Sequence, residues 1–282
     1  MKKYTYLLIA AVVAVTVFLA NRAEPAFQNT DGTVSVHFID VGQADSILVC
    51  ANGETMLIDA GTKKMSYRVV DYLNKRRIKR IDHLVATHPH EDHIGGMADV
   101  IDQFEIGALY MPKETANTKT FENMVKSAKA KGLQAKVPKT GDRIPLKNTE
   151  CTVLAPTNGF YESVNNYSIV LRLVYGNTSF LFTGDAEELS ESEILRSGFE
   201  VQADVLKIGH HGSQTSTSEA FLKAVSPKYA IISVGAGNSY GHPNENVIER
   251  LEKNGVTIYR TDFDKDIVVY SDGKQYFEEK RK

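Results

Sequence analysis

Three histidines and two carboxylates lie within six consecutive residues of the segment Thr87-His-Pro-His-Glu-Asp-His-Ile-Gly-Gly96. The apolar run 83–87 leads into this segment and predicts a strand. Zinc, manganese and iron bind imidazole and carboxylate groups, and alternate side chains leaving a strand can converge on one point. We expect His88 and His90 to face one metal ion, and Asp92 and His93 a second. A solvated histidine-rich loop is disfavoured, because six of the eight histidines fall in three short motifs.

The pattern His-x-His-x-Asp-His, followed by Gly-Gly, resembles the signature of the metallo-β-lactamase superfamily. The resemblance implies an α/β (α+β) fold, the αββα four-layer sandwich, built as a single domain. Asp59, in Leu57-Ile-Asp-Ala-Gly61, resembles the family aspartate that braces the metal loop without binding metal. Asp185, in Phe182-Thr-Gly-Asp185, resembles the aspartate that bridges two metals. A bridging carboxylate is reasonable, because two neighbouring divalent ions need an anion between them.

Three further motifs narrow the resemblance. They are His37-Phe-Ile-Asp-Val-Gly-Gln-Ala-Asp-Ser-Ile-Leu-Val49, Lys207-Ile-Gly-His-His-Gly-Ser213 and Tyr240-Gly-His-Pro243. In this order they resemble the hydrolase domain of ComEC, the DNA-uptake channel of competent bacteria. The sequence shows no multi-helix channel, so it looks like the hydrolase domain alone behind an export signal. The same pattern also resembles a choline-phosphate esterase of bacterial surfaces.

The positions of the histidines in the sequence leave two questions about the metal ligands open. Most of the superfamily has a further histidine before the bridging aspartate, whereas no histidine lies between His93 and His210 here. Asn165 or Asn166 could stand in with its amide, or water could take the place, so one metal should be held more weakly. In extended backbone His210 and His211 would point opposite ways, so only one could bind metal. The esterase resemblance favours His211 as that ligand, with His210 orienting a neighbour or contacting substrate.

Other polar residues are expected near the metals. His242 is a proton donor, a contact to substrate phosphate, or the rival of His211 as a ligand; a solvated turn histidine is the alternative. Asp40, Gln43 and Asp45 of the opening motif are expected to support the ligands from behind, or else simply to form a turn. Asn166 and Lys207 are assigned the same supporting role.

This set of residues predicts a hydrolase with two divalent metal ions, zinc or manganese. Two metals lower the pKa of a shared water, and Asp92 would orient the resulting hydroxide while His210 or His242 protonates the leaving oxygen. A phosphodiesterase or nuclease is the favoured interpretation, with single-stranded DNA or a choline-phosphate-type surface ester as substrate. Hydrolysis of a lactam, lactone or thioester is one alternative. A non-enzymatic surface protein with a vestigial metal site is another.

Short β-type runs alternate with helical patterns from residue 34 to 278, without a low-complexity linker. This pattern predicts one hydrolase domain, 34–278, with helices covering sheets. Strands are expected at 34–39, 46–49, 55–58, 83–87, 108–111, 152–154, 168–174, 179–182, 205–208, 230–234, 257–259 and 267–270. Helices are expected at 66–75, 95–104, 120–131, 187–197, 218–225 and 244–254.

The N-terminus has the character of an export segment. Lys2 and Lys3 precede an uncharged run, 4–20, that predicts a cleaved signal peptide or a retained anchor over residues 1–26. The positive-inside rule then places the remainder outside the cytoplasm, secreted or anchored, touching the membrane only through this segment. The net charge of −2 gives no bulk-charge argument for nucleic acid, and we expect a monomer. Cys50 and Cys151 are compatible with a disulfide or with two buried thiols.

Overall fold

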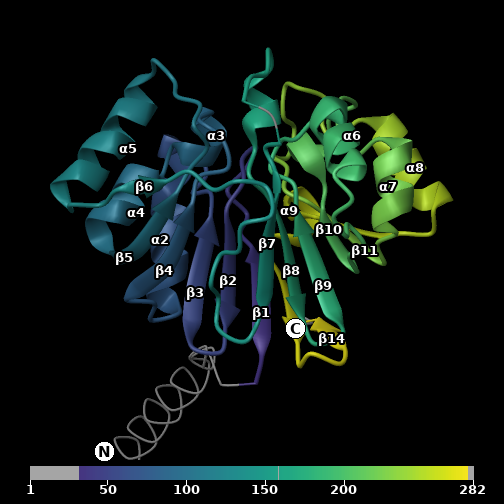
Figure 1. Cartoon of the computed structure of the whole chain (residues 1–282), viewed down its shortest axis with the longest axis horizontal. Helices are drawn as coiled ribbons and strands as arrows, with labels where there is room; N and C mark the ends of the chain where they lie inside the picture. Colours follow the sequence, from purple (N-terminus) through teal and green to yellow (C-terminus); the bar gives the residue numbers. More distant parts are fainter. Residues whose placement is uncertain (1–31, 158, 279–282) are drawn as a thin grey trace, which may run out of the picture.

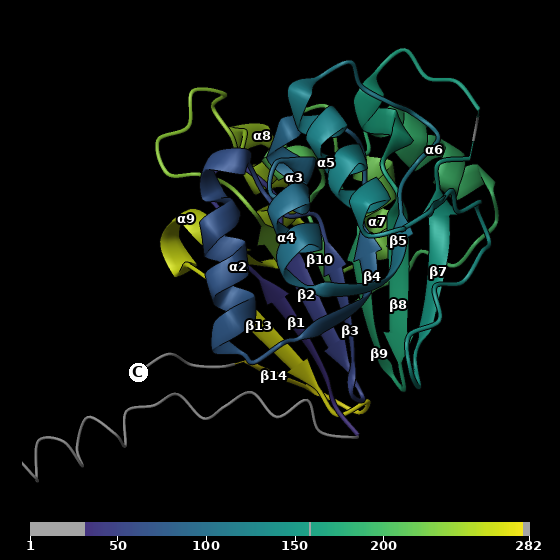
Figure 2. The same ribbon diagram turned by 90° about the vertical axis from the view of Figure 1, so that its left-hand side faces the viewer.

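The computed structural model describes residues 32–157 and 159–278, and the expected export segment, 1–26, lies outside these residues. Two sheets lie face to face with helices on both outer sides, as Figure 1 and Figure 2 show. This arrangement is the four-layer αββα sandwich, so the predicted fold class is confirmed. Among the described residues, no helix has the length and apolar character needed to cross a bilayer.

Each sheet mixes parallel and antiparallel neighbours. In spatial order the strands of the first sheet are β14 (Tyr276–Glu278), β13 (Ile267–Ser271), β1 (Val34–Phe38), β2 (Ile47–Ala51), β3 (Glu54–Ile58), β4 (Arg80–Val85), β5 (Glu105–Tyr110) and β6 (Ala135–Lys136). The strands of the second sheet are β12 (Thr257–Arg260), β11 (Tyr229–Ile232), β10 (Val205–Lys207), β9 (Thr178–Phe182), β8 (Val170–Tyr175) and β7 (Glu150–Ala155).

Helices cover the outer faces of the sheets, and short helices form part of some connections between strands. The α-helices are α2 (Ser66–Lys75), α3 (Glu91–Ile94), α4 (Met97–Gln103), α5 (Lys119–Ala130), α6 (Glu188–Arg196), α7 (Glu219–Val225), α8 (Glu245–Lys253) and α9 (Thr261–Asp264). Three short 3-10 helices are η1 (Lys63–Met65), η2 (Val164–Tyr167) and η3 (Gly209–Gly212). Helix α2 has the bounds that its apolar spacing predicts, whereas the predicted helix 95–104 is shorter and is preceded by the separate α3.

Apolar side chains fill the three spaces between the layers. Phe38 and Phe182 pack between the sheets, with ring centroids 6.4 Å apart. On the outer faces, Val69 of α2 packs with the first sheet and Phe221 of α7 with the second. Cys50 belongs to the outer layer of the first sheet and Cys151 to the space between the sheets, and both are free thiols. Of the two cysteine alternatives, the structure therefore has the buried thiols.

The strand directions gather the functional loops at one edge. β3, β4 and β5 run parallel in the first sheet, and β9, β10, β11 and β12 run parallel in the second. Loops that follow parallel neighbouring strands leave the sheet at the same edge, where ligand sites of α/β folds form. The loops after β3, β4, β9, β10 and β11 carry Asp59, the expected metal ligands and His242, so the topology brings these residues together.

Candidate metal centre

The histidine-rich segment changes from loop to helix halfway along. β4 ends at Val85, His88 follows it, and His90 precedes the first turn of α3, which contains Asp92 and His93. Two glycines let this helix pack closely against the loop after β3. A Cβ atom on Gly96 would lie 2.2 Å from the carbonyl oxygen of Ala60. The Gly-Gly pair of the motif is therefore a packing requirement of the metal loop.

Four residues form a compact cluster suited to one metal ion. Ligand atoms of Asp92, His93, Asp185 and His211 all lie within 4.8 Å of one another. His93 Nε2 is 3.2 Å from Asp185 Oδ2, and His211 Nε2 is 3.3 Å from Asp92 Oδ2. The mixture of imidazole and carboxylate is the donor set that divalent transition metals prefer.

The remaining histidines of the motif lie near the same carboxylate. His88 Nε2 is 3.9 Å from Asp185 Oδ2 and 3.0 Å from His90 Nδ1. Asp185 thus touches both histidine groups, the position that a bridging ligand requires. Asp185 Oδ1 supports a metal more directly, because it is buried without a hydrogen-bond partner. Buried polar atoms rarely stay unsatisfied, so these residues fit a bound cation.

The structure corrects the prediction that His210 and His211 point in opposite directions. Both residues have left-handed backbone, with φ of 49° and 55°, and not the extended backbone that the prediction assumed. Their Nε2 atoms each lie 3.8 Å from Asp185 Oδ2, so both rings turn toward the centre. His211 is buried, whereas the His210 side chain is 24% exposed. The assumption of extended backbone is therefore wrong, while of the two residues His211 alone belongs to the four-residue cluster.

Asp59 supports His93 from the side away from the centre. Its Oδ2 lies 2.7 Å from His93 Nδ1 and accepts a hydrogen bond from Thr87 Oγ1, while Oδ1 accepts from the Thr87 amide. A histidine whose Nδ1 is bound to a carboxylate presents Nε2 to a metal with fixed ring orientation. Asp59 is itself in the left-handed region, at φ 58°, which aspartate tolerates better than most residues.

A buried ion pair stands behind His211. The ammonium of Lys207, which is fully buried, lies 2.7 Å from Asp45 Oδ2. Asp45 Oδ1 lies 3.4 Å from His211 Nδ1, and the Ser233 carbonyl oxygen lies 2.9 Å from the same nitrogen. Since Asp45 follows β1 and Lys207 ends β10, the pair links the two sheets next to the cluster.

The two asparagines occupy the region where a further histidine was expected. Asn166 Oδ1 accepts hydrogen bonds from the amides of Glu187 and Ser190, so it fixes the start of α6. Asn165 Nδ2 is 3.2 Å from Glu187 Oε1 and 3.4 Å from His210 Nδ1, and its Oδ1 is buried without a partner. Of the two amides, Asn165 is therefore the one with a free acceptor.

Asp40, Gln43 and His242 were also expected near the metals, and each has surroundings different from those of the four-residue cluster. Asp40 accepts a hydrogen bond from the Gly42 amide and lies 3.8 Å from Lys265 Nζ, facing α9 rather than the histidines. Gln43 Oε1 accepts a hydrogen bond from the Gly235 amide and so fixes the loop after β11. His242 lies in that loop, with its ring centroid 5.6 Å from that of His210. Its Nδ1 is buried without a partner, and the residue is not part of the four-residue cluster.

Two contacts were missed by sequence reasoning. Thr87 binds Asp59, and Ser168 Oγ lies 3.3 Å from His88 Nδ1 while accepting a hydrogen bond from the Asp185 amide. Thr87 directly precedes the metal motif, so its position was a usable signal. Ser168 gave no such signal, because only folding brings the start of β8 beside β4 and β9.

Neighbouring carboxylates raise the pKa values of two buried imidazoles in the cluster, those of His93 and His211. Burial alone would lower the pKa of His211, but Asp185 and Asp45 outweigh it and raise that pKa to about 10. Burial likewise opposes charge on His93, and Asp185 and Asp59 raise its pKa well above the usual value. The metal-free chain therefore keeps both imidazoles protonated at neutral pH.

We expect metal binding at pH 7 to release protons. A metal can bind only a deprotonated imidazole nitrogen, so His93 and His211 must each lose a proton. Because both pKa values are raised, metal affinity should increase as the pH rises from 6 to 8. Calorimetric titration with Zn²⁺ in buffers of different ionisation enthalpy measures the release. The His83→Gln variant, which changes a buried histidine outside the cluster, should behave like the parent; binding heats independent of the buffer would contradict the prediction.

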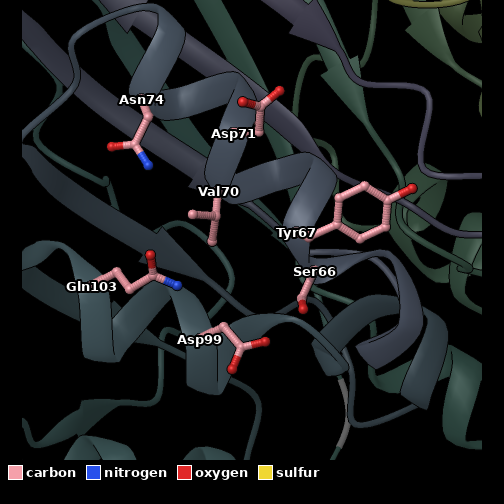
Figure 3. A pocket seen from close by; sticks show the side chains of 7 residues that line it. All are labelled: Ser66, Tyr67, Val70, Asp71, Asn74, Asp99 and Gln103. Carbon is pink, nitrogen blue, oxygen red and sulfur yellow. The ribbon is translucent and has the colours of Figure 1, made fainter.

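A separate hollow lies between α2 and α4, away from the histidines (Figure 3). Val70, Asn74 and Gln103 line it together with Asp99, whose carboxylate is bound by Lys63. Its lining contains no histidine or cysteine, and its two carboxylates, Asp71 and Asp99, are already paired with Lys75 and Lys63. The chemistry of the molecule therefore lies at the histidine cluster.

Comparison with known proteins agrees with this geometry. Residues 39–236 match the family model described as Metallo-beta-lactamase superfamily. ComE operon protein 3 of Bacillus subtilis is 33% identical over 245 residues, covering 80% of this chain and 32% of that protein. Competence protein ComA of Neisseria gonorrhoeae is 32% identical over 254 residues, covering 89% of this chain and 34% of that protein. The chain thus spans about a third of the length of these relatives.

A solved structure shows the same fold at low identity. The metallo-beta-lactamase fold protein YhfI from Bacillus subtilis superposes with a TM-score of 0.58 and 12% identity, covering 85% of this chain and 100% of that one. At this identity the likeness concerns the arrangement of layers and strands. The resemblance to ComEC-like competence proteins rests instead on the sequence relatives.

Proposed function

This chain belongs to the metallo-β-lactamase superfamily of metal-dependent hydrolases, and from that premise we propose that it is an extracytoplasmic phosphodiesterase with two divalent ions, zinc or manganese. One ion would be held by Asp92, His93 and His211, and the other by His88 and His90, with Asp185 shared between them. When bound, the ions supply a nucleophile by lowering the pKa of a water, and they neutralise charge on the attacked group.

The substrate assignment rests on the partly exposed histidines next to the buried ligands. His90, His210 and His242 are each at least partly exposed, whereas His88 and His93 beneath them are fully buried. The partly exposed imidazoles that are not assigned to a metal, those of His210 and His242, can donate hydrogen bonds to the non-bridging oxygens of a phosphodiester. A β-lactam, with one carboxylate and one leaving nitrogen, would use fewer of them.

Three residues of the chain would each have a separate role in hydrolysis. Asp92 stays anionic, because its pKa is about 2: burial opposes the charge, but His93 and a hydrogen bond from His211 outweigh it. Its side chain is 32% exposed, so it can orient the attacking water as well as bind a cation. His210 lies between Asp185 and His242, where it can protonate the leaving oxygen. His242 would contact the phosphate.

The relatives suggest the polymer that carries the phosphodiester. Their names refer to competence and recombination, processes that handle DNA, so single-stranded DNA is the substrate we favour. The N-terminal pattern of Lys2, Lys3 and the uncharged run supports location outside the cytoplasm, secreted or anchored. A monomer with this segment as its only membrane contact is the simplest assembly.

A four-substrate assay tests the proposed function. The full chain, loaded with Mn²⁺ or Zn²⁺, is offered single-stranded DNA, a small phosphodiester, a choline phosphate ester and nitrocefin. We expect both phosphodiesters to be cleaved far faster than nitrocefin, and chelation to abolish cleavage. Efficient nitrocefin turnover without phosphodiester cleavage would overturn the substrate and leave the metal centre in place. Cleavage of the choline ester alone would move the substrate from DNA to a surface polymer.

A further inference from the structure

The loop from Gly235 to Pro243, here called the rim loop, follows β11 and is held in one conformation by its own polar contacts. Asn238 Oδ1 accepts hydrogen bonds from the amides of Tyr240 and His242. Asn238 Nδ2 donates to the carbonyl oxygens of Gly235 and His242. Because Gln43 also accepts from the Gly235 amide, the loop is fixed to the rest of the molecule.

This fixed loop presents a large aromatic ring to solvent. Tyr240 is 73% exposed, and its ring stacks on that of His242 at 5.8 Å between centroids and 24° between planes. The imidazole of His242 thus lies beside the tyrosine ring in a nearly parallel orientation, while most of the tyrosine side chain faces water. An exposed aromatic on an ordered loop contributes little to folding, and it offers a flat apolar face and a polar end to a ligand.

Tyr240 is the outermost of three neighbouring rings, and the innermost of these, that of His210, lies at the metal centre. His242 lies between Tyr240 and His210, whose ring centroid is 5.6 Å from that of His242. His210 Nε2 in turn lies 3.8 Å from Asp185 Oδ2. A base stacked on Tyr240 would thus lie next to a phosphate placed at His242 and His210.

We propose that Tyr240 is a stacking platform for a nucleobase of the substrate, next to the phosphodiester that is cleaved. The inference rests on the proposed function and adds the class of group that the substrate must carry. A planar base suits the site because it can continue the stack of Tyr240 on His242, and the sugar spans from base to phosphate. Stacking without hydrogen bonds to base edges accepts any base, so cleavage should depend little on sequence.

A quaternary ammonium group is the rival ligand for an exposed tyrosine. Such cations are held by several aromatic rings that form a cage, and by negative charge nearby. Among the described residues, the ring next to Tyr240 is an imidazole, followed by a second imidazole at His210. These rings follow one another in a row and do not form a cage, so the surroundings favour a base.

The chain contains no tryptophan, which gives a direct binding assay. In the Tyr240→Trp variant, placed in an Asp92→Asn background to prevent cleavage, the single indole reports stacking by quenching of its fluorescence. Short single-stranded oligonucleotides should quench it. Matched oligonucleotides with abasic sites throughout should bind roughly 5- to 150-fold more weakly, the range for loss of base stacking on an aromatic side chain. Phosphocholine is the competing probe.

Kinetics on the active protein complete the test. Tyr240→Ala should raise KM for normal oligonucleotides by about tenfold, with kcat little changed, and leave KM for abasic ones unaltered. Tyr240→Phe should retain the wild-type KM. Tyr67→Ala is the matched control, because Tyr67 is 62% exposed but lies in the α2–α4 hollow.

The outcomes separate this inference from the proposed function. Equal KM changes for normal and abasic substrates, or equal quenching by both, would overturn the nucleobase platform while cleavage itself persisted. Base-dependent quenching without cleavage of any phosphodiester would support the platform and overturn the proposed function. Quenching by phosphocholine but not by oligonucleotides would assign Tyr240 to a cationic ligand and overturn the inference.

Discussion

Asp92→Asn should reduce phosphodiester hydrolysis by about a thousandfold or more, since metal-centred charge stabilisation contributes several kcal/mol. The substitution keeps the side-chain volume but removes the anionic oxygen that lies 3.3 Å from His211 Nε2. The fold should survive, because Asp92 is partly exposed. Steady-state assays, metal analysis and thermal unfolding of the same preparation separate these effects.

The matched control for this prediction is Asp99→Asn. Asp99 lies on α4, close in sequence, and its carboxylate binds Lys63 at the surface. Its variant should keep wild-type turnover and metal content. If Asp92→Asn also keeps both, Asp92 is neither a ligand nor the residue that orients the attacking water.

Asp59→Ala should lower the free energy of unfolding by roughly 3–5 kcal/mol, the cost of removing one partner from a buried charged pair. The substitution leaves the buried His93 imidazole and both Thr87 donors without their acceptor. Alanine also tolerates the left-handed backbone at φ 58° poorly, which adds roughly 1 kcal/mol. Metal affinity should fall as well, because the His93 ring loses its orientation.

Urea unfolding of the metal-free and metal-loaded protein measures both losses. Asp59→Asn is the matched control, since it keeps the volume, tolerates the backbone conformation and can still accept from Thr87. It should therefore lose less stability than Asp59→Ala. An Asp59→Ala protein as stable as the parent, with unchanged metal affinity, would show that this carboxylate does not support His93.

Local sequence determined the elements and most of the metal motif. The bounds of α2 follow from the apolar spacing of Val69 and Leu73, which is visible within one helix. The segment from His88 to His93 places its groups together because they are neighbours along the chain. Asp185 could be recognised because two apolar runs lead into it, as β8 and β9. Short-range patterns of this kind depend on the backbone period, which a sequence displays directly.

Tertiary structure alone decided how the second half of the site is arranged. His210 and His211 take left-handed backbone where strand geometry was expected, while the His210 amide is bound to the Gly184 carbonyl oxygen. A Cβ atom on the neighbouring Gly212 would lie 2.5 Å from Pro243 Cβ, so the turn also packs against the rim loop. The pairing of Asp45 with Lys207 joins residues 162 positions apart (207 − 45) across two sheets. Contacts between distant segments leave no periodic trace in a sequence, because their energies depend on which loops the completed sheets bring to one edge.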